Sequence, residues 1–405
     1  MAHKTGLRVA RSARWDGYRC QWTQSFPDGY TRQAGPALYS GSAGTALFLA
    51  ELYARTNCGE AKRAARGAVL HALSEISDLP SNASGLFSGR IGILVAALRT
   101  SHALGDSSLE DQAIDLVLGV IDIAYRSEKY DLLEGTAGIV IGILALAKSV
   151  PTLGAIAGVF GERLIAMADR GAIGWSWNSG QTALPLVGLA HGASGAAYAL
   201  LELYRSTGTM RFRVGAEQAM AFERAHADPG NGIWPDFRHP IADAYIRRGD
   251  VDGLHRAKDA GLIPSWRPGV MNAWCHGAPG IALVRTRASE ILGQTIYADE
   301  AKAAFSATVR ELNAREDRPF RSIADASLCH GMAGLAEALR VGSMKLDIAH
   351  WHTRSEEAIA RTWHAVVAAY DAVPPLDVGL MMGESGLGVA LMAHSDRAPD
   401  SILLL

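Results

Sequence analysis

Cysteine is scarce in this chain, with four residues among 405, and neither sign of charge dominates, with 39 basic against 41 acidic side chains. So few cysteines exclude a disulfide framework and leave thiol chemistry as their use. The balanced charge argues against a nucleic-acid surface, which needs clustered Lys and Arg. The longest apolar run, residues 137–147, is shorter than the roughly 18 residues that span a membrane. The first residues also lack an apolar signal region, so we expect a cytoplasmic protein with no membrane span and no nucleic-acid partner.

Glycine, by contrast, is abundant, and fourteen of the 43 glycines form pairs in a recurring pattern. A Gly-x-x-Gly followed by an apolar stretch occurs seven times, and successive copies are 48, 46, 57, 85, 54 and 52 residues apart. One such pair would carry no information, but seven at a near-constant step indicate an internal repeat. The first glycines of the pairs are Gly41, Gly89, Gly135, Gly192, Gly277, Gly331 and Gly383.

Each repeat predicts a helical hairpin. The residues after each glycine pair are apolar on nearly every face, which predicts an inner helix buried all round. Amphipathic stretches between them predict outer helices, and no convincing alternating strand pattern competes. The outer helices are expected at residues 61–78, 108–126, 153–170, 214–227, 297–315 and 354–370.

The hairpins are expected to close into a ring. An open solenoid needs polar repeats at both ends, whereas the first and last apolar stretches here are as apolar as the middle ones. The predicted fold is therefore all-α: a seven-fold α/α toroid, which is a double-layered α/α barrel of helical hairpins. We expect residues 1–405 to form this ring as a single domain.

Two segments depart from the period. Residues 228–271, between the fourth and fifth repeats, are rich in Pro, Gly, Trp and charge, and are expected to form an insertion, a loop or small excursion beside the site. Residues 1–40 are expected to be an irregular N-terminal segment, because they do not resemble a seventh outer helix. The wall of the ring is therefore expected to be thin there, or to be completed by another chain.

The residues just before each glycine pair share the centre of such a ring, and three consecutive repeats place a histidine there: His191, His276 and His330. Cys275 and Cys329 precede two of these histidines in the same register. Two thiolates and one imidazole favour tetrahedral zinc, and three protein ligands leave a fourth position open, as in catalytic sites. The alternative is that both cysteines are small buried apolar residues.

An open zinc with two thiolate ligands suits thiol alkylation better than hydrolysis, because such a metal is a poor source of hydroxide. His191 is the candidate acid/base group at the neighbouring repeat. Asp131, four residues before Gly135, is a candidate to orient that histidine or stabilise its charge. The alternatives are that His191 is a packing residue and that Asp131 caps a helix.

The motifs GLAHGASG, AWCHGAPG and SLCHGMAG, with four further Gly-x-x-Gly repeats, resemble the lanthionine synthetase C-like family. The resemblance extends over nearly the whole chain and implies a toroid with a central zinc. It implies that Cys275, Cys329 and His330 hold the metal and that His191 and Asp131 serve in acid/base steps. His276, and Glu134 at the lip of the third repeat, are expected to line the site without binding metal.

The resemblance implies a zinc-dependent lanthipeptide cyclase. A cysteine of a precursor peptide, which carries a leader and a dehydrated core, would add to dehydroalanine or dehydrobutyrine and form lanthionine or methyllanthionine. Dehydration would come from a separate dehydratase or kinase/lyase protein. Three alternatives stay open: glutathione addition to dehydrated residues, a non-catalytic zinc-stabilised peptide-binding scaffold, and a carbohydrate enzyme, which would need paired central carboxylates.

Overall fold

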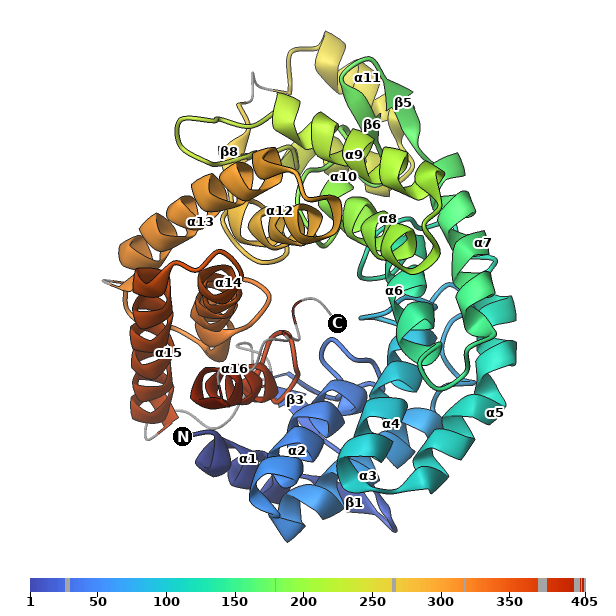
Figure 1. The fold of residues 1–405 in the computed structure, drawn as a ribbon, viewed down its shortest axis with the longest axis vertical. Coiled ribbons are helices and arrows are strands. Elements are labelled where there is room, and N and C mark those ends of the chain that lie inside the picture. Colours follow the sequence, from blue (N-terminus) through green and yellow to red (C-terminus); the bar gives the residue numbers. More distant parts are fainter. Residues whose placement is uncertain are drawn as a thin grey trace.

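Seven apolar helices form the inner layer of a ring in the computed structural model of the chain (Figure 1). The structure describes residues 1–25, 30–178, 180–263, 267–316, 318–370, 377–396, 401 and 403. Each inner helix contacts the next, and the last contacts the first, so the ring is closed as the repeat predicts. In order, these helices are α2 (Ser42–Thr56), α4 (Arg90–Leu104), α6 (Thr136–Leu146), α8 (Ala193–Thr207), α12 (Ala278–Leu292), α14 (Met332–Lys345) and α16 (Glu384–Asp396).

A second layer of helices surrounds the first. Six outer helices each pack on the inner helix that precedes them in the chain, and they lie at the six amphipathic stretches. Their charged faces meet water, while their apolar faces bury the core between the two layers. They are α3 (Gly59–Ser74), α5 (Ser107–Ala124), α7 (Leu153–Ala166), α9 (Met210–Ala225), α13 (Thr295–Glu316) and α15 (Ala349–Tyr370).

The expectation that residues 1–40 supply no seventh outer helix is wrong. Helix α1 (Ala2–Arg11) contacts α16, α2 and α3 and closes the outer layer between the last repeat and the first. With ten residues it is shorter than the other outer helices, and its apolar face is small, with Val9 and Ala10 buried. Its buried positions are Thr5, Gly6, Val9 and Ala10, so it lacks the buried large apolar side chains by which the other outer helices can be recognised. Helix α1 therefore occupies the place in the wall that another chain was expected to complete.

The glycine pairs are explained by close packing. A Cβ on the second glycine of every pair would lie 1.7–2.5 Å from the carbonyl oxygen of the residue six positions earlier. At Gly92, for instance, the distance to the Leu86 oxygen would be 1.7 Å. Only glycine lets the first turn of the inner helix fold back this closely on the loop that leads into it.

These loops are joined by a closed circle of backbone hydrogen bonds. In each loop an amide donates to a carbonyl of the next, and the residues involved lie two positions, or once three, before the first glycine of the pair. The bonds run from Tyr39 to Phe87 (2.7 Å), Phe87 to Leu133 (3.0 Å), Leu132 to Ala190 (3.1 Å), Ala190 to Cys275 (3.0 Å), Cys275 to Cys329 (3.3 Å), Cys329 to Met381 (2.9 Å) and Met381 to Tyr39 (2.8 Å). Because both cysteines belong to this circle, their backbones are fixed by the fold as a whole.

The structure also contains short β-hairpins between the helices, although the sequence showed no strand pattern. They are β1 (Arg14–Asp16) with β2 (Arg19–Gln21), β3 (Thr23–Ser25) with β4 (Thr31–Gln33), β5 (Asp169–Gly171) with β6 (Gly174–Ser176), and β7 (Pro235–Asp236) with β8 (Gly269–Val270), all antiparallel. Strands of two or three residues are too short to produce an alternating pattern.

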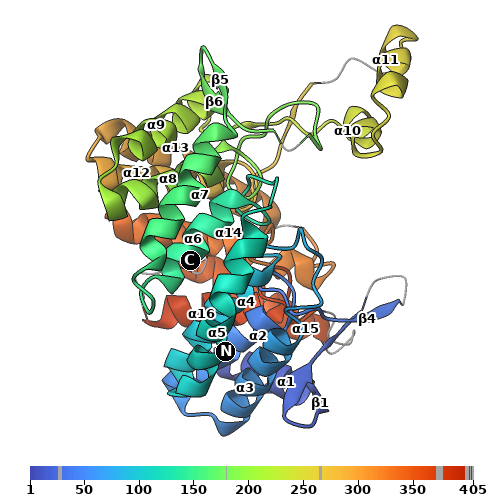
Figure 2. The same cartoon turned by 90° about the vertical axis from the view of Figure 1, so that its right-hand side faces the viewer.

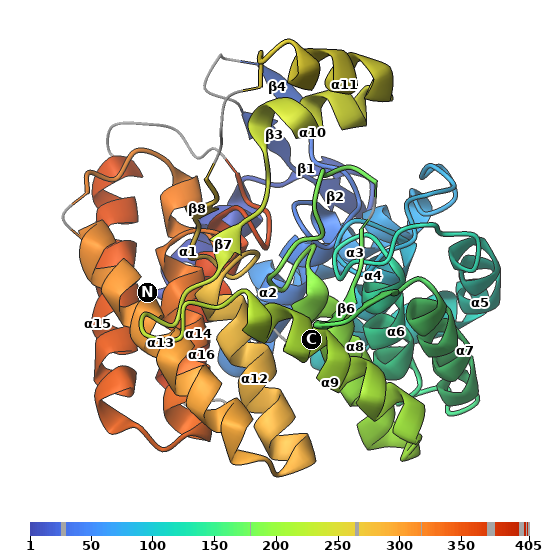
Figure 3. The same ribbon diagram turned by 90° about the horizontal axis from the view of Figure 1, so that it is seen from above.

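Residues 228–271 form more than a loop, although residues 264–266 lie outside the described ranges. Strands β7 and β8 make a neck, and beyond it α10 (Pro240–Arg247) and α11 (Val251–Asp259) stand away from the ring (Figures 2 and 3). Within the described part of the chain, no helix has both the length and the apolar character needed to cross a membrane.

Candidate metal centre and active site

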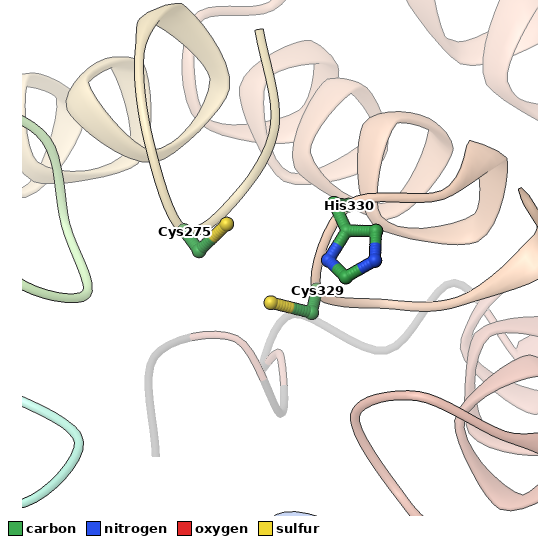
Figure 4. Close-up of side chains that lie close together, drawn as sticks. All are labelled: Cys275, Cys329 and His330. Carbon is green, nitrogen blue, oxygen red and sulfur yellow. The ribbon is translucent and has the colours of Figure 1, made fainter. Parts of the chain in front are cut away.

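Cys275, Cys329 and His330 meet where two loops of the hydrogen-bonded circle adjoin. One ligand atom from each lies within 4.8 Å of the others. Figure 4 shows their side chains close together, Cys275 from the loop before α12, and Cys329 and His330 from the loop before α14. Cys329 is buried and the other two are half-buried.

The pKa values of the two thiols are shifted in opposite directions. A hydrogen bond from Cys329 lowers the pKa of Cys275 against the opposing effect of burial, and His330 lowers it further. The same hydrogen bond, with burial and the negative charge of Cys275, raises the pKa of Cys329. Cys275 is therefore the more acidic of the two thiols, and the thiolate is the ionic form of cysteine that binds metals.

The donor set fits zinc. Two soft sulfur donors and an imidazole are the ligands that tetrahedral zinc takes in catalytic Cys₂His sites, where the fourth position stays free for another molecule. The spread of the three donor atoms, 4.8 Å at most, permits a shared ion. The backbone bond from the Cys275 amide to the Cys329 carbonyl, at 3.3 Å, holds the two loops in this register.

His191 lies in the adjoining loop of the circle and is paired with Asp131. Its Nδ1 is 3.0 Å from Asp131 Oδ2, and its backbone neighbour Ala190 donates to the Cys275 carbonyl. The Asp131 side chain is 8% exposed and that of His191 46%, so a shielded carboxylate orients a ring that a substrate can reach. Burial alone would lower the pKa of His191, but the hydrogen bond and charge of Asp131 outweigh it and raise that pKa.

Asp131 is not the cap of an inner helix, because Gly135 occupies that position. Its Oδ1 accepts instead from the Glu134 amide at 2.7 Å, which fixes the carboxylate while Oδ2 faces His191. Glu134 itself forms an ion pair with Lys129, and its charge adds to the rise in the pKa of His191.

His276 lies outside the metal-binding group. It is 4% exposed, and its Nε2 lies 3.6 Å from Asp236 Oδ1 at the neck of the insertion, without a hydrogen-bond partner. Burial lowers the pKa of His276 against the opposing charge of Asp236. The neck thus contacts the residue next to Cys275, although α10 and α11 stand away from the ring (Figure 2).

Two neighbours of the thiols were missed by the sequence analysis. Tyr39 shares a hydrogen bond with Cys329 and occupies the same repeat register as the cysteines, a signal that the sequence did contain. Arg238, paired with Asp236 at 2.6 Å, contributes positive charge that acts on both Cys329 and His276. It comes from the non-repeating insertion, so the repeat register could not indicate it.

A two-layered ring of helical hairpins with a Cys, Cys and His group between two of its loops defines a helical toroid with a candidate metal centre. The chain belongs to the lanthionine synthetase C-like family, whose model, described as "Lanthionine synthetase C-like protein", matches residues 32–404. The resemblance seen in the motifs is thereby confirmed.

A solved structure shows the same fold. Nisin cyclase superposes with a TM-score of 0.68 at 17% sequence identity, covering 98% of this chain and 94% of the other. A GH76A alpha-1,6-mannanase from Salegentibacter sp. HEL1_6 superposes less well, with a TM-score of 0.49 at 12% identity over 89% of this chain and 100% of the other.

Proposed function

We propose that this protein is a zinc-dependent lanthipeptide cyclase, which adds cysteine thiols of a precursor peptide to dehydroalanine or dehydrobutyrine. The observation that carries the proposal is the Cys275, Cys329 and His330 group beside an oriented His–Asp pair, in a chain that belongs to the lanthionine synthetase C-like family. The fold shared with nisin cyclase is consistent with it.

In the proposed reaction, zinc held by Cys275, Cys329 and His330 would lower the pKa of an incoming cysteine thiol and keep its sulfur nucleophilic. The sulfur forms a bond to the β-carbon of the dehydrated residue, and the electron pair of the double bond moves onto the α-carbon and its carbonyl as an enolate. The thiol loses one proton and the α-carbon gains one, so the reaction is balanced without any other reactant.

His191 is proposed to carry this proton. Its raised pKa favours the imidazolium, which can donate to the α-carbon of the enolate, and Asp131 stabilises the positive charge and fixes which ring nitrogen faces the substrate. Because the ring is partly exposed whereas Asp131 is shielded, the histidine is the member of the pair that meets the peptide.

The acceptor in this chemistry is a dehydrated residue, so we propose that the precursor peptide, with leader and dehydrated core, has already met a dehydratase or kinase/lyase protein. We propose that both proteins act in the cytoplasm. The wall near residues 1–40, which another chain was expected to complete, offers no docking place for this partner, since α1 fills that position.

Metal analysis tests the site. We expect about one zinc per chain in the wild type and its loss in Cys329→Ala, as a three-ligand site requires all three donors. Cys58→Ala is the matched control, because that thiol lies outside the metal-binding group and its removal should leave the zinc in place. A wild-type protein that binds no zinc would contradict the proposal.

Activity is tested with a synthetic peptide that contains one dehydroalanine and one cysteine. Ring closure removes the free thiol without a change in mass, so alkylation followed by mass spectrometry counts the remaining thiol. We expect His191→Ala to abolish closure and His102→Ala, an exposed histidine, to retain it. An adduct formed only with added glutathione would support intermolecular addition instead, and peptide binding without turnover would support a scaffold.

A further inference from the structure

Arg315, near the end of outer helix α13, contacts both loops that carry the proposed ligands. Its Nη1 donates to the carbonyl oxygen of His330 at 2.6 Å, and its Nη2 donates to that of Asn272 at 3.0 Å. Its Nε donates to Glu311 Oε1 at 2.6 Å, one turn earlier on the same helix. With its side chain 20% exposed, Arg315 is held by three hydrogen bonds in one orientation.

The two carbonyls belong to different repeats. His330 and Asn272 are 58 positions apart in the chain, and Asn272 lies three residues before Cys275. Arg163 on α7 makes a similar pair of bonds at 2.6 Å each, but to Tyr125 and Ser127 of a single loop. Both arginines use the planar guanidinium to bridge two oxygens, but only the Arg315 bridge links the two loops of the metal-binding group.

Arg315 complements the backbone circle. Inside the site, the Cys275 amide bonds to the Cys329 carbonyl at 3.3 Å; outside it, the guanidinium joins the same two loops a few residues away. With the backbone bond alone, the two loops could rotate relative to each other. The backbone bond and the guanidinium bridge together resist this rotation. The spacing between the sulfur of Cys275 and the donors of Cys329 and His330 therefore depends on both.

We propose that Arg315 is a positioning residue of the metal centre, which sets the distance between the Cys275 loop and the Cys329–His330 loop. This inference rests on the proposed metal-binding function. Outer-shell groups that orient ligands typically change metal affinity by about 10–100-fold when removed. The role lies in the fork geometry rather than in the charge. A lysine, whose compact ammonium sits on a flexible stem, lacks the rigid fork that holds the two carbonyl oxygens at a fixed spacing.

The experiment compares zinc affinity in the full-length wild type, Arg315→Ala, Arg315→Lys and the control Arg163→Ala, measured by competition with a chelator. We expect both Arg315 variants to bind zinc about 10–100-fold more weakly and Arg163→Ala to bind it like the wild type. Cobalt substitution supplies a second measurement, since its absorption bands report ligand geometry. These bands should change in the Arg315 variants alone.

Thermal unfolding of the metal-free proteins distinguishes positioning from a general loss of structure, because Arg315→Ala and Arg163→Ala each lose two bonds to backbone carbonyls. Arg315→Ala also loses its pair with Glu311, and Arg163→Ala its contact with the Tyr125 ring, so the two variants should be destabilised to a similar extent. Zinc affinity and cobalt spectra in both Arg315 variants that match the wild type would overturn the inference, as would an equal loss of affinity in Arg163→Ala. Should the wild type bind no zinc, the metal-binding function itself would fail, an outcome distinct from unchanged affinity in the variants.

Discussion

Replacement of Glu223 by alanine should destabilise the protein more than the same replacement of an exposed charged residue. This residue of α9 is fully buried, and its carboxylate accepts four hydrogen bonds. Oε1 accepts from the amides of Gly188 (2.8 Å) and Ser194 (2.9 Å), and Oε2 accepts from Ser194 Oγ (2.6 Å) and Arg285 Nη2 (3.1 Å). Gly188 and Ser194 flank His191, so the carboxylate also anchors the loop that carries the proposed acid.

The magnitude follows from what Glu223→Ala leaves behind. Removal of one partner of a buried ion pair costs about 3–5 kcal/mol, and the lower figure applies because Arg285, itself fully buried, retains Glu300 at 2.6 Å. An unfolding entropy of about 2.1 cal/mol/K per residue gives about 0.85 kcal/mol/K for 405 residues. A loss of about 3 kcal/mol therefore lowers Tm by about 3.5 °C.

Differential scanning calorimetry measures this change. Glu217→Ala is the matched control: it lies on the same helix and pairs with Arg213 at 3.1 Å, but its side chain is 29% exposed. A pair of that kind contributes at most about 1 kcal/mol, so its loss lowers Tm by about 1 °C. If Glu223→Ala lowered Tm no more than Glu217→Ala, the reasoning from burial would be refuted.

Two further predictions concern Asp131 and the glycine pairs. Against the opposing effect of burial, Asp131 raises the pKa of His191, so NMR titration should give a lower pKa for His191 in Asp131→Asn. A histidine whose pKa is raised by folding stabilises the folded state at pH values below its pKa in the unfolded chain, and this contribution is lost as the pH rises through its pKa in the folded protein. The difference in unfolding free energy between wild type and Asp131→Asn should therefore be larger at about pH 6 than at about pH 9. Equal differences at the two pH values would count against this role of Asp131. Gly92→Ala places a Cβ 1.7 Å from the Leu86 oxygen and should cost about 3 kcal/mol in urea denaturation. Gly119→Ala, in helix α5 with open space around it, should instead stabilise the protein by about 1 kcal/mol, and similar effects at the two sites would contradict the packing argument.

Much of the ring could be predicted because every repeat must meet the same packing requirement at the start of its inner helix. The second glycine of every pair meets a carbonyl oxygen six residues earlier, so the same residue recurs wherever an inner helix begins. The apolar stretches after these glycines predicted the inner helices, and the amphipathic stretches predicted six outer ones. The register that aligned His191 with His276 and His330, and Cys275 with Cys329, also brought these residues into adjoining loops of one circle.

Features that occur once were not predictable in this way. Helix α1 buries no large apolar side chain beyond Val9, and its role as the seventh outer helix depends on contacts with α16 and α3, which lie far apart in the chain. Arg238 and Asp236 reach the site from an insertion without a repeat register. Arg315 resembles any other helix-surface arginine in sequence, because its partners are backbone carbonyls of distant residues.

The sequence by itself determined the helical hairpin, its sevenfold repetition and the residue types that approach the centre, since these depend on local periodicity and on spacing along the chain. The tertiary structure decided which loops adjoin, and hence that Cys275 lies beside Cys329 and His330 while His276 turns toward Asp236. Closure of the ring is the physical reason: hydrogen bonds between the loops join residues far apart in the chain, and no local pattern encodes a distance that only the closed circle imposes.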